Sequence, residues 1–151
     1  MYGVNLRPYG EYFAKAQAVT TTETVGNQTD NNPSRLDASQ GGTAIVVATE
    51  KATGTLSVAA SGTLTLSVYA GTSATDASPI KIGTAIYTNT SSTAAATFGA
   101  DAKVLEYILP TDVLQARPYV TIKLQSSGST AADVTGNVDV FPHYISHPRR
   151  G

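Results

Sequence analysis

The sequence predicts an all-β chain, folded as a two-sheet sandwich or a small barrel, and three observations support that class. Thr, Ser, Ala and Gly together supply a little under half of the 151 residues. Thr packs well on a pleated sheet because its Cβ is branched, and the residues that favour long exposed helices are sparse. Several segments alternate apolar and polar residues with a period of two, and clusters of turn-forming residues separate them. About seven or eight strands are expected, with little room for helix.

The first predicted strands lie between residues 43 and 70. The continuous apolar run 43–49 is typical of a strand buried on both faces. The next two segments show clean alternation, with apolar residues at Leu56 and Val58 and then at Leu64, Leu66 and Val68. The connection 59–62 is short enough to join these two strands as a hairpin.

The second half of the chain continues the same pattern. Residues 80–87 hold three isoleucines, and the Ser/Thr/Asp-rich stretch 71–79 before them predicts a loop. Residues 104–109 fit either a strand or one turn of helix, and Pro110 ends either one. The last two strands alternate clearly, with Val120, Ile122 and Leu124 on one face and then Val134, Val138 and Val140. Gly136 inside the final run predicts a bulge or a close backbone approach.

The two ends differ from the alternating middle. Residues 1–12 hold three tyrosines and Pro8, and residues 142–151 contain two prolines. We therefore predict an N-terminal arm at 1–12, one β domain at 13–141 and a C-terminal arm at 142–151. Within the domain, the polar and turn-rich segment 24–39 is expected to be a surface loop.

Composition excludes several classes of protein. The formal net charge is −1, only 14% of residues are charged, and no basic cluster occurs before Arg149 and Arg150, so nucleic-acid binding is not expected. No apolar run approaches the roughly 18 residues of a membrane span, and the N-terminus does not resemble a signal peptide. There is no cysteine, which excludes disulfides, thiolate metal sites and cysteine nucleophiles.

Catalytic and metal-binding patterns are weak. His143 and His147 are four residues apart, but the flanking prolines disfavour the helix that would bring both to one metal ion. Asp30-Asn31-Asn32 lacks the spaced carboxylates of a calcium loop, and a turn before Pro33 explains it more simply. No nucleophile stands beside a base, and no glycine-rich phosphate loop is present. We expect neither enzymatic activity nor a cofactor or metal.

Contacts with partner proteins are the more plausible role for the unusual residues. Tyrosine is enriched at interfaces because its ring is apolar and its hydroxyl is polar. The two arms also carry histidines and arginines that could face acidic groups on a neighbour. The candidate contact residues are Tyr2, Tyr9, Tyr12, His143, Tyr144, His147, Arg149 and Arg150.

Over residues 11–141 the sequence resembles the jelly-roll cement (decoration) proteins of tailed bacteriophages. Such proteins open with an aromatic residue just before an Ala-Gln-Ala-x-Thr stretch, and an Asp near a Gly pair follows later. Next comes a strand that leads into a Ser/Thr/Asp loop ending in Pro. Near the end, an Arg and an aromatic residue precede an alternating strand. The matching residues are Phe13, Ala16-Gln17-Ala18-Val19-Thr20, Leu36-Asp37 with Gly41-Gly42, Val68 to Pro79, and Arg117-Pro118-Tyr119-Val120. The tyrosine-rich start and the tail PHYISHPRRG lie outside this resemblance.

The resemblance implies an antiparallel jelly-roll-like two-sheet sandwich with extended arms. It also implies a structural protein of the virion, made in the host cytoplasm, that binds the outer surface of the capsid and bridges copies of the major capsid protein. Self-association as a homodimer, or else a trimer, is expected. The alternative from another class is a carbohydrate-binding module on a tail or fibre. We further expect removal of residues 143–151 to weaken attachment to the shell more than folding.

Overall fold

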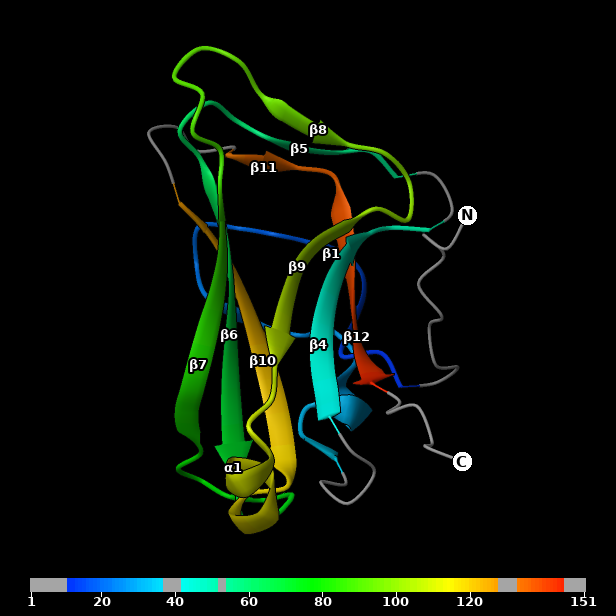
Figure 1. Cartoon of the computed structure of the whole chain (residues 1–151), viewed down its shortest axis with the longest axis vertical. Helices are drawn as coiled ribbons and strands as arrows, with labels where there is room; N and C mark the ends of the chain where they lie inside the picture. The colour runs from blue at the N-terminus through cyan, green and yellow to red at the C-terminus, as the bar shows by residue number, and fades with distance from the viewer. Residues whose placement is uncertain (1–10, 37–41, 52–53, 128–132, 146–151) are drawn as a thin grey trace, which may run out of the picture.

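The computed structural model describes residues 11–36, 42–51, 54–127 and 133–145, which form two facing antiparallel sheets and a small third sheet at one end (Figure 1). One main sheet, the β4 sheet, has the order β1-β12-β4-β9. The other, the β6 sheet, has the order β2-β10-β6-β7, and β3 also pairs with β10. The end sheet has the order β11-β5-β8. The strands are β1 (Ala14–Ala18), β2 (Thr24–Val25), β3 (Ser34–Arg35), β4 (Gly42–Thr49), β5 (Leu56–Val58), β6 (Thr63–Gly71), β7 (Ile80–Thr88), β8 (Ala96–Phe98), β9 (Lys103–Ile108), β10 (Tyr119–Ser127), β11 (Val134–Thr135) and β12 (Asn137–Ile145).

The strand order of the two main sheets is that of a jelly roll. The short strands β2 and β3 both pair with β10 and occupy one position, and the end sheet lies outside the two main layers. Eight strand positions remain. When they are numbered in chain order, the β4 sheet has the order 1-8-3-6 and the β6 sheet has the order 2-7-4-5. Two interlocked Greek keys produce this order. The predicted antiparallel jelly-roll-like sandwich is confirmed.

The core lies between the two main sheets and uses the predicted inward faces. Each buried Leu, Ile or Val contributes about 1.5–3 kcal/mol relative to exposure, so these alternating positions supply most of the driving force for folding. Strand β4 is buried on both faces, as its continuous apolar run predicts. The fully buried inward residues include Phe13, Leu56, Val58, Leu64, Leu66, Val68, Val120, Ile122, Val138 and Val140.

One segment contains more regular structure than predicted, and a second resolves an open alternative. Segment 24–39 was predicted as a surface loop, but its described part contains β2, a 3-10 turn (Thr29–Asn31) and β3. These strands are two residues long, which is too short to show alternation. Segment 104–109, which periodicity left open, falls mainly in strand β9, and helix α1 (Thr111–Ala116) starts directly after Pro110.

The last strand also runs past the predicted start of the C-terminal arm at residue 142. Strand β12 continues to Ile145, and its end pairs with β4, from Pro142 opposite Ile45 to Ile145 opposite Gly42. The carbonyl of Val140 points toward β1, where it accepts a hydrogen bond from the N–H of Phe13. The ring nitrogen of Pro142, two residues on, faces the same side, beyond the start of β1. The missing N–H therefore interrupts no ladder with β4, and the strand extends to Ile145.

The end sheet forms where three connections between the main sheets meet (Figure 1, top). Strand β5 lies between β4 and β6, β8 between β7 and β9, and β11 between β10 and β12. The side chain of Asn89, just after β7, ties two of these connections together, the one that contains β5 and the one that contains β8. Its amide N–H groups donate to the carbonyls of Val58 and Ala59, both at 3.1 Å, and of Ala94 at 2.8 Å.

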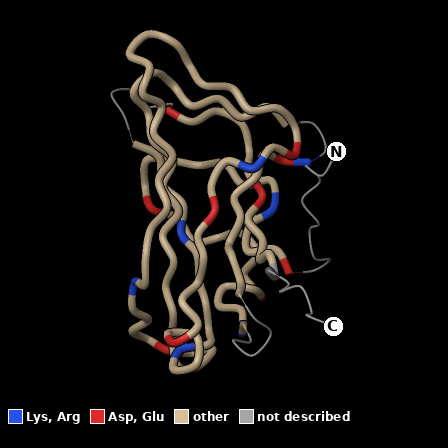
Figure 2. The backbone as a smooth tube through the Cα atoms, viewed as in Figure 1, with Lys and Arg blue, Asp and Glu red and all other residues tan. Residues whose placement is uncertain are grey.

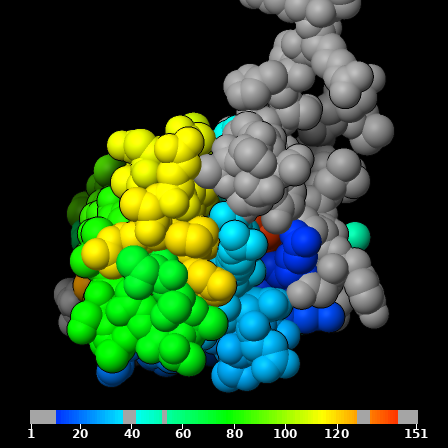
Figure 3. All heavy atoms as spheres, turned by 90° about the horizontal axis from the view of Figure 1, so that it is seen from below, coloured from blue at the N-terminus to red at the C-terminus, as the bar shows by residue number. Residues whose placement is uncertain are grey.

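At the opposite end, the predicted loop 72–79 is closed by Asp76. Its carboxylate accepts hydrogen bonds from the N–H groups of Thr72 and Ser78, both at 2.9 Å, and lies 3.7 Å from the guanidinium of Arg117. These interactions, the hydrogen bond from Thr72 first, hold the pKa of Asp76 below its usual range. Viewed from this end, the α1 region and the β6–β7 loop lie side by side (Figure 3).

Candidate docking face on the β4 sheet

The two ends of the described chain meet on the β4 sheet. Strands β1 and β12 are neighbours, with Ala14 opposite Val140. Just before β1, the ring of Tyr12 packs edge-on against the ring of Phe141, with centroids 5.9 Å apart and an interplanar angle of 69°. Such edge-to-face pairs are favourable by about 0.5–1.5 kcal/mol beyond the area they bury. A segment from each end of the jelly roll therefore reaches the same outer face.

This outer face carries an apolar cluster that is separate from the core. Val46 and Ala48 on β4 and Phe141 on β12 point away from the sandwich, opposite to inward neighbours such as Val47 and Val140. Their exposed fractions are only 2%, 0% and 0%, and Tyr12 packs against them. The outer face of an antiparallel sheet is normally polar, so a buried phenylalanine there is unusual. We call Tyr12, Val46, Ala48 and Phe141 the outer strip.

Two of the predicted contact residues lie on this face. Tyr12 belongs to the outer strip, and half-buried His143 follows Phe141 on the same face of β12, opposite Ala44. Tyr144 is within β12 and pairs with Thr43, and its side chain lies outside what the structure describes. The remaining candidates, Tyr2, Tyr9, His147, Arg149 and Arg150, also fall outside the described residues.

A small charged pocket adjoins the outer strip. It has a volume of about 200 Å³ and is lined by Tyr12, Lys15, Ala16, Glu50, Lys51 and Asp139. The N–H of Ala16, at a bulge in β1 where φ is +48°, donates to the carboxylate of Asp139 at 2.7 Å. The ammonium of Lys15 lies 5.7 Å from the centre of the Tyr12 ring. The pocket thus offers both cationic and anionic groups beside an apolar surface.

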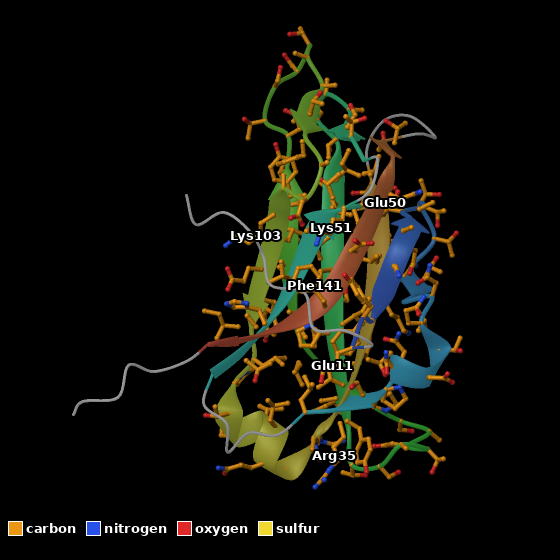
Figure 4. All side chains as sticks on the ribbon, turned by 90° about the vertical axis from the view of Figure 1, so that its right-hand side faces the viewer. Glu11, Arg35, Glu50, Lys51, Lys103 and Phe141 are labelled. Atoms are coloured by element: carbon orange, nitrogen blue, oxygen red, sulfur yellow. The ribbon has the colours of Figure 1, made fainter. Side chains whose placement is uncertain are left out.

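Charges surround the outer strip without crossing it. Figure 4 shows Lys103, Lys51 and Glu50 above Phe141 and Glu11 below it. Elsewhere on the described backbone, acidic and basic residues are sparse (Figure 2), and some of them pair, as Arg117 does with Asp76 and Lys123 with Glu23. An apolar centre with a charged margin is typical of a surface that packs against a further segment of protein.

Sequence reasoning missed most of this face. The continuous apolar run 43–49 predicted that Val46 and Ala48 are buried, but it did not indicate which side of the sheet each of them faces. The available signal was Phe141. It has an odd position number whereas the inward Val138 and Val140 have even ones, so it places a large apolar residue on the face that was expected to be polar. The local sequence did not predict the charged pocket, because only the strand order brings Lys15, Glu50 and Lys51 together.

The residues weighed for metal binding have other roles. Among the described residues there is no group of three or more His, Cys, Asp or Glu placed to hold a metal ion. Asn31 and Asn32, once considered for calcium, donate hydrogen bonds to the carbonyls of Tyr12 and Phe13. No helix in the described part of the chain is long and apolar enough to cross a membrane.

A scan against protein-family models, a search of curated proteins and a search of solved structures each found no match to this chain.

The outer face of the β6 sheet has a different character. Its outward positions carry mainly hydroxyl groups, and the register aligns them in rows, such as Ser127, Thr63 and Thr88 across three strands. Ile86, opposite Thr65, is 58% exposed on this face. The face is flat and weakly charged, and it presents no buried apolar cluster comparable to the outer strip within the described residues.

One aromatic ring on the β6 sheet is already engaged. The hydroxyl of Tyr69 donates to the carboxylate of Glu23 at 2.7 Å, and the ammonium of Lys123 lies 4.5 Å from the ring centre. The hydrogen bond to Glu23, followed by burial, raises the pKa of Tyr69 because both favour the protonated phenol. A sugar stacking on this face of the ring would have to displace Lys123.

Proposed function

We propose that this protein is a structural component of a tailed-phage virion that binds the outer surface of the head and stabilises the mature capsid lattice by bridging capsid subunits. The proposed partners are the major capsid protein and further copies of this chain, as a homodimer or trimer. The sequence resemblance suggests the role, and the jelly-roll strand order agrees with the fold that the resemblance implies.

The observation that carries the proposal is the meeting of both chain ends on one outer face. All the candidate contact residues are in the two terminal parts of the sequence, and the strands next to them, β1 and β12, pair with each other in the β4 sheet. Tyr12 and His143 already lie on that face. Contacts made from both ends of the domain would then lie on one side of the molecule, which suits attachment across a junction between capsid subunits.

Binding across subunit junctions of the shell does not require any single strong contact. A protein that binds only the assembled shell stabilises it by mass action. Contacts repeated over a lattice add their effects, and linked contacts raise the effective concentration of each other. A near-zero net charge limits repulsion between neighbouring copies.

The decisive measurement is the copy number of this protein in purified virions. Quantitative mass spectrometry should give a ratio to the major capsid protein within about a few-fold of one, because a lattice contact repeats with the capsid subunit. A handful of copies per particle would contradict a lattice-wide role and favour a tail or fibre location. In that case, a clear hit on a glycan array would support the carbohydrate-binding alternative.

Trimming the C-terminal tail should separate attachment from folding. Because residues 143–145 belong to β12, the truncation should remove residues 146–151 rather than 143–151. We expect heads to bind the truncated protein about tenfold more weakly, a loss of about 1.4 kcal/mol, with little change in melting temperature. Two double variants of the full-length chain serve as controls for charge. Arg149→Ala with Arg150→Ala removes both cations, whereas Arg149→Lys with Arg150→Lys keeps them. A large drop in melting temperature with unchanged binding would contradict the prediction.

A further inference from the structure

We propose that the outer strip is the docking site for residues 1–10 of the same chain, which lie along it as an extra layer on the β4 sheet. The inference concerns the free protein and does not rest on the proposed function. It is carried by the burial of the strip, the route of the chain and the pattern of the segment.

The burial of Phe141 requires a cover. The ring points away from the core and its exposed fraction is 0%, as is that of Ala48, while Val46 is 2% exposed. Among the described hydrophobic residues, Tyr12 is the one that packs onto this cluster from outside. One tyrosine ring in an edge contact covers only part of a surface that extends over two strands. We expect a further length of chain to cover the rest of the strip.

Residues 1–10 are joined to the strip through Glu11 and Tyr12. Tyr12 stands on Phe141 only two residues before β1 begins, so the chain enters the structure across the strip. Ten extended residues span up to about 33–36 Å. The eight residues of β4 span about 26 Å at 3.3 Å per residue. Residues 1–10 are therefore long enough to cover the strip along its whole length.

The sequence of the segment matches the surface. Tyr2, Val4 and Leu6 alternate with Gly3, Asn5 and Arg7, so an extended segment would present one apolar side. That side complements the outer strip.

Cysteine labelling tests the proposal directly because the chain contains no cysteine. In Ala48→Cys, a maleimide should react slowly with the full-length protein, because a covered thiol reacts only after local opening. Removing residues 1–10 should raise the rate by about tenfold or more. Two control positions calibrate the result. Val47→Cys, in the core, should stay slow in both forms, and Thr88→Cys, on the exposed edge strand, should react equally fast in both.

Point variants keep the test valid if the truncated chain folds poorly. In the full-length Ala48→Cys protein, Leu6→Asp should speed labelling because it places a charge against the strip. The matched variant Asn5→Asp, on the opposite side of the segment, should leave the rate unchanged. Circular dichroism melts would establish that each variant is folded before labelling.

Three outcomes would overturn the proposal. The first is fast labelling of Ala48→Cys in the full-length chain, which would mean an open strip. The second is equal, slow labelling with and without residues 1–10, which would mean a different cover. The third is protection that disappears on dilution, which would assign the cover to a second copy of the chain. All measurements use purified protein without heads, so the outcome is separate from the test of capsid binding.

Discussion

Replacing Asn32 with alanine is expected to lower the free energy of unfolding by about 2–4 kcal/mol. The Asn32 side-chain N–H groups donate to the carbonyls of Phe13 at 2.7 Å, Gln28 at 2.9 Å and Gly26 at 3.1 Å. Its side-chain oxygen accepts from the N–H of Ile122 at 3.2 Å. Alanine removes all four bonds and leaves the backbone groups of partly buried residues without these partners.

The position of Asn32 explains why the loss should be large. Strand β10 pairs with β2 at Lys123 and Leu124 and with β3 at Tyr119 and Val120. Between these short strands, the Asn32 side chain bonds the N–H of Ile122 as a strand partner would. It also reaches Phe13, next to β1, so a single side chain joins the β6 sheet to the β4 sheet.

Chemical denaturation with two companion variants would test this prediction. Asn32→Asp keeps the shape but replaces the donor with a carboxylate facing three carbonyl oxygens, so it should destabilise at least as much as alanine. Asn27→Ala is the control, because Asn27 is exposed and its side chain mainly bonds the backbone of Lys15. It should cost about 1 kcal/mol or less. Equal losses at Asn27 and Asn32 would contradict a special role for Asn32.

Replacing Gly136 with alanine is expected to cost about 3–5 kcal/mol. Gly136 has φ of +99°, a conformation that residues with a Cβ rarely adopt. A Cβ at this position would lie 2.2 Å from the carbonyl oxygen of Thr55 and 3.2 Å from the Cα of Leu56. The added methyl group therefore meets both backbone strain and a collision with backbone atoms that cannot rotate away.

Gly136 occupies the junction between two sheets. Strand β11 ends at Thr135 in the end sheet, and β12 begins at Asn137 in the β4 sheet. A shift that relieved the collision would disturb either the pairing of β11 with β5 or the first pairs of β12. The strain is therefore expected to unfold the junction rather than relax locally.

Thermal melting of Gly136→Ala beside Gly99→Ala would measure the effect. A Cβ at Gly99 meets no atom within 4 Å, so that variant should be neutral or slightly stabilising, by up to about 1 kcal/mol. If Gly136→Ala melted at the same temperature as Gly99→Ala, the close approach to Thr55 would be disproved.

Some features of the protein follow from local sequence alone. The all-β class and the inward faces of β6, β10 and β12 were predictable because side chains alternate along a strand. The close approach at Gly136 was also predictable, because an isolated glycine in a strand pattern usually marks such a place. Loop 71–79 was recognisable from its turn-forming residues.

Other features depend on contacts between residues far apart in the chain. The sequence of β12 is compatible with several neighbours, and only the folded chain places β1 on one side of it and β4 on the other. Gln17, in the Ala-Gln-Ala motif, illustrates this dependence. Its amide donates to the carbonyl of Val25 and accepts from the N–H of Asn27, contacts that need the turn between β1 and β2 to be formed.

The sequence by itself therefore determined the class of fold, the core-facing positions and the loop 71–79, because these depend on period and on local backbone preference. The predicted hairpin at 59–62 was wrong, because β5 pairs with β8 and β11 in the end sheet and not with β6. The tertiary structure alone decided the jelly-roll order, the end sheet, the role of Asn32 and the outer strip. Tyr12 and Phe141 are 129 positions apart in the sequence, and no local pattern links them. They meet because the first and last strands of the domain pair, and that pairing is set by the burial of the whole core.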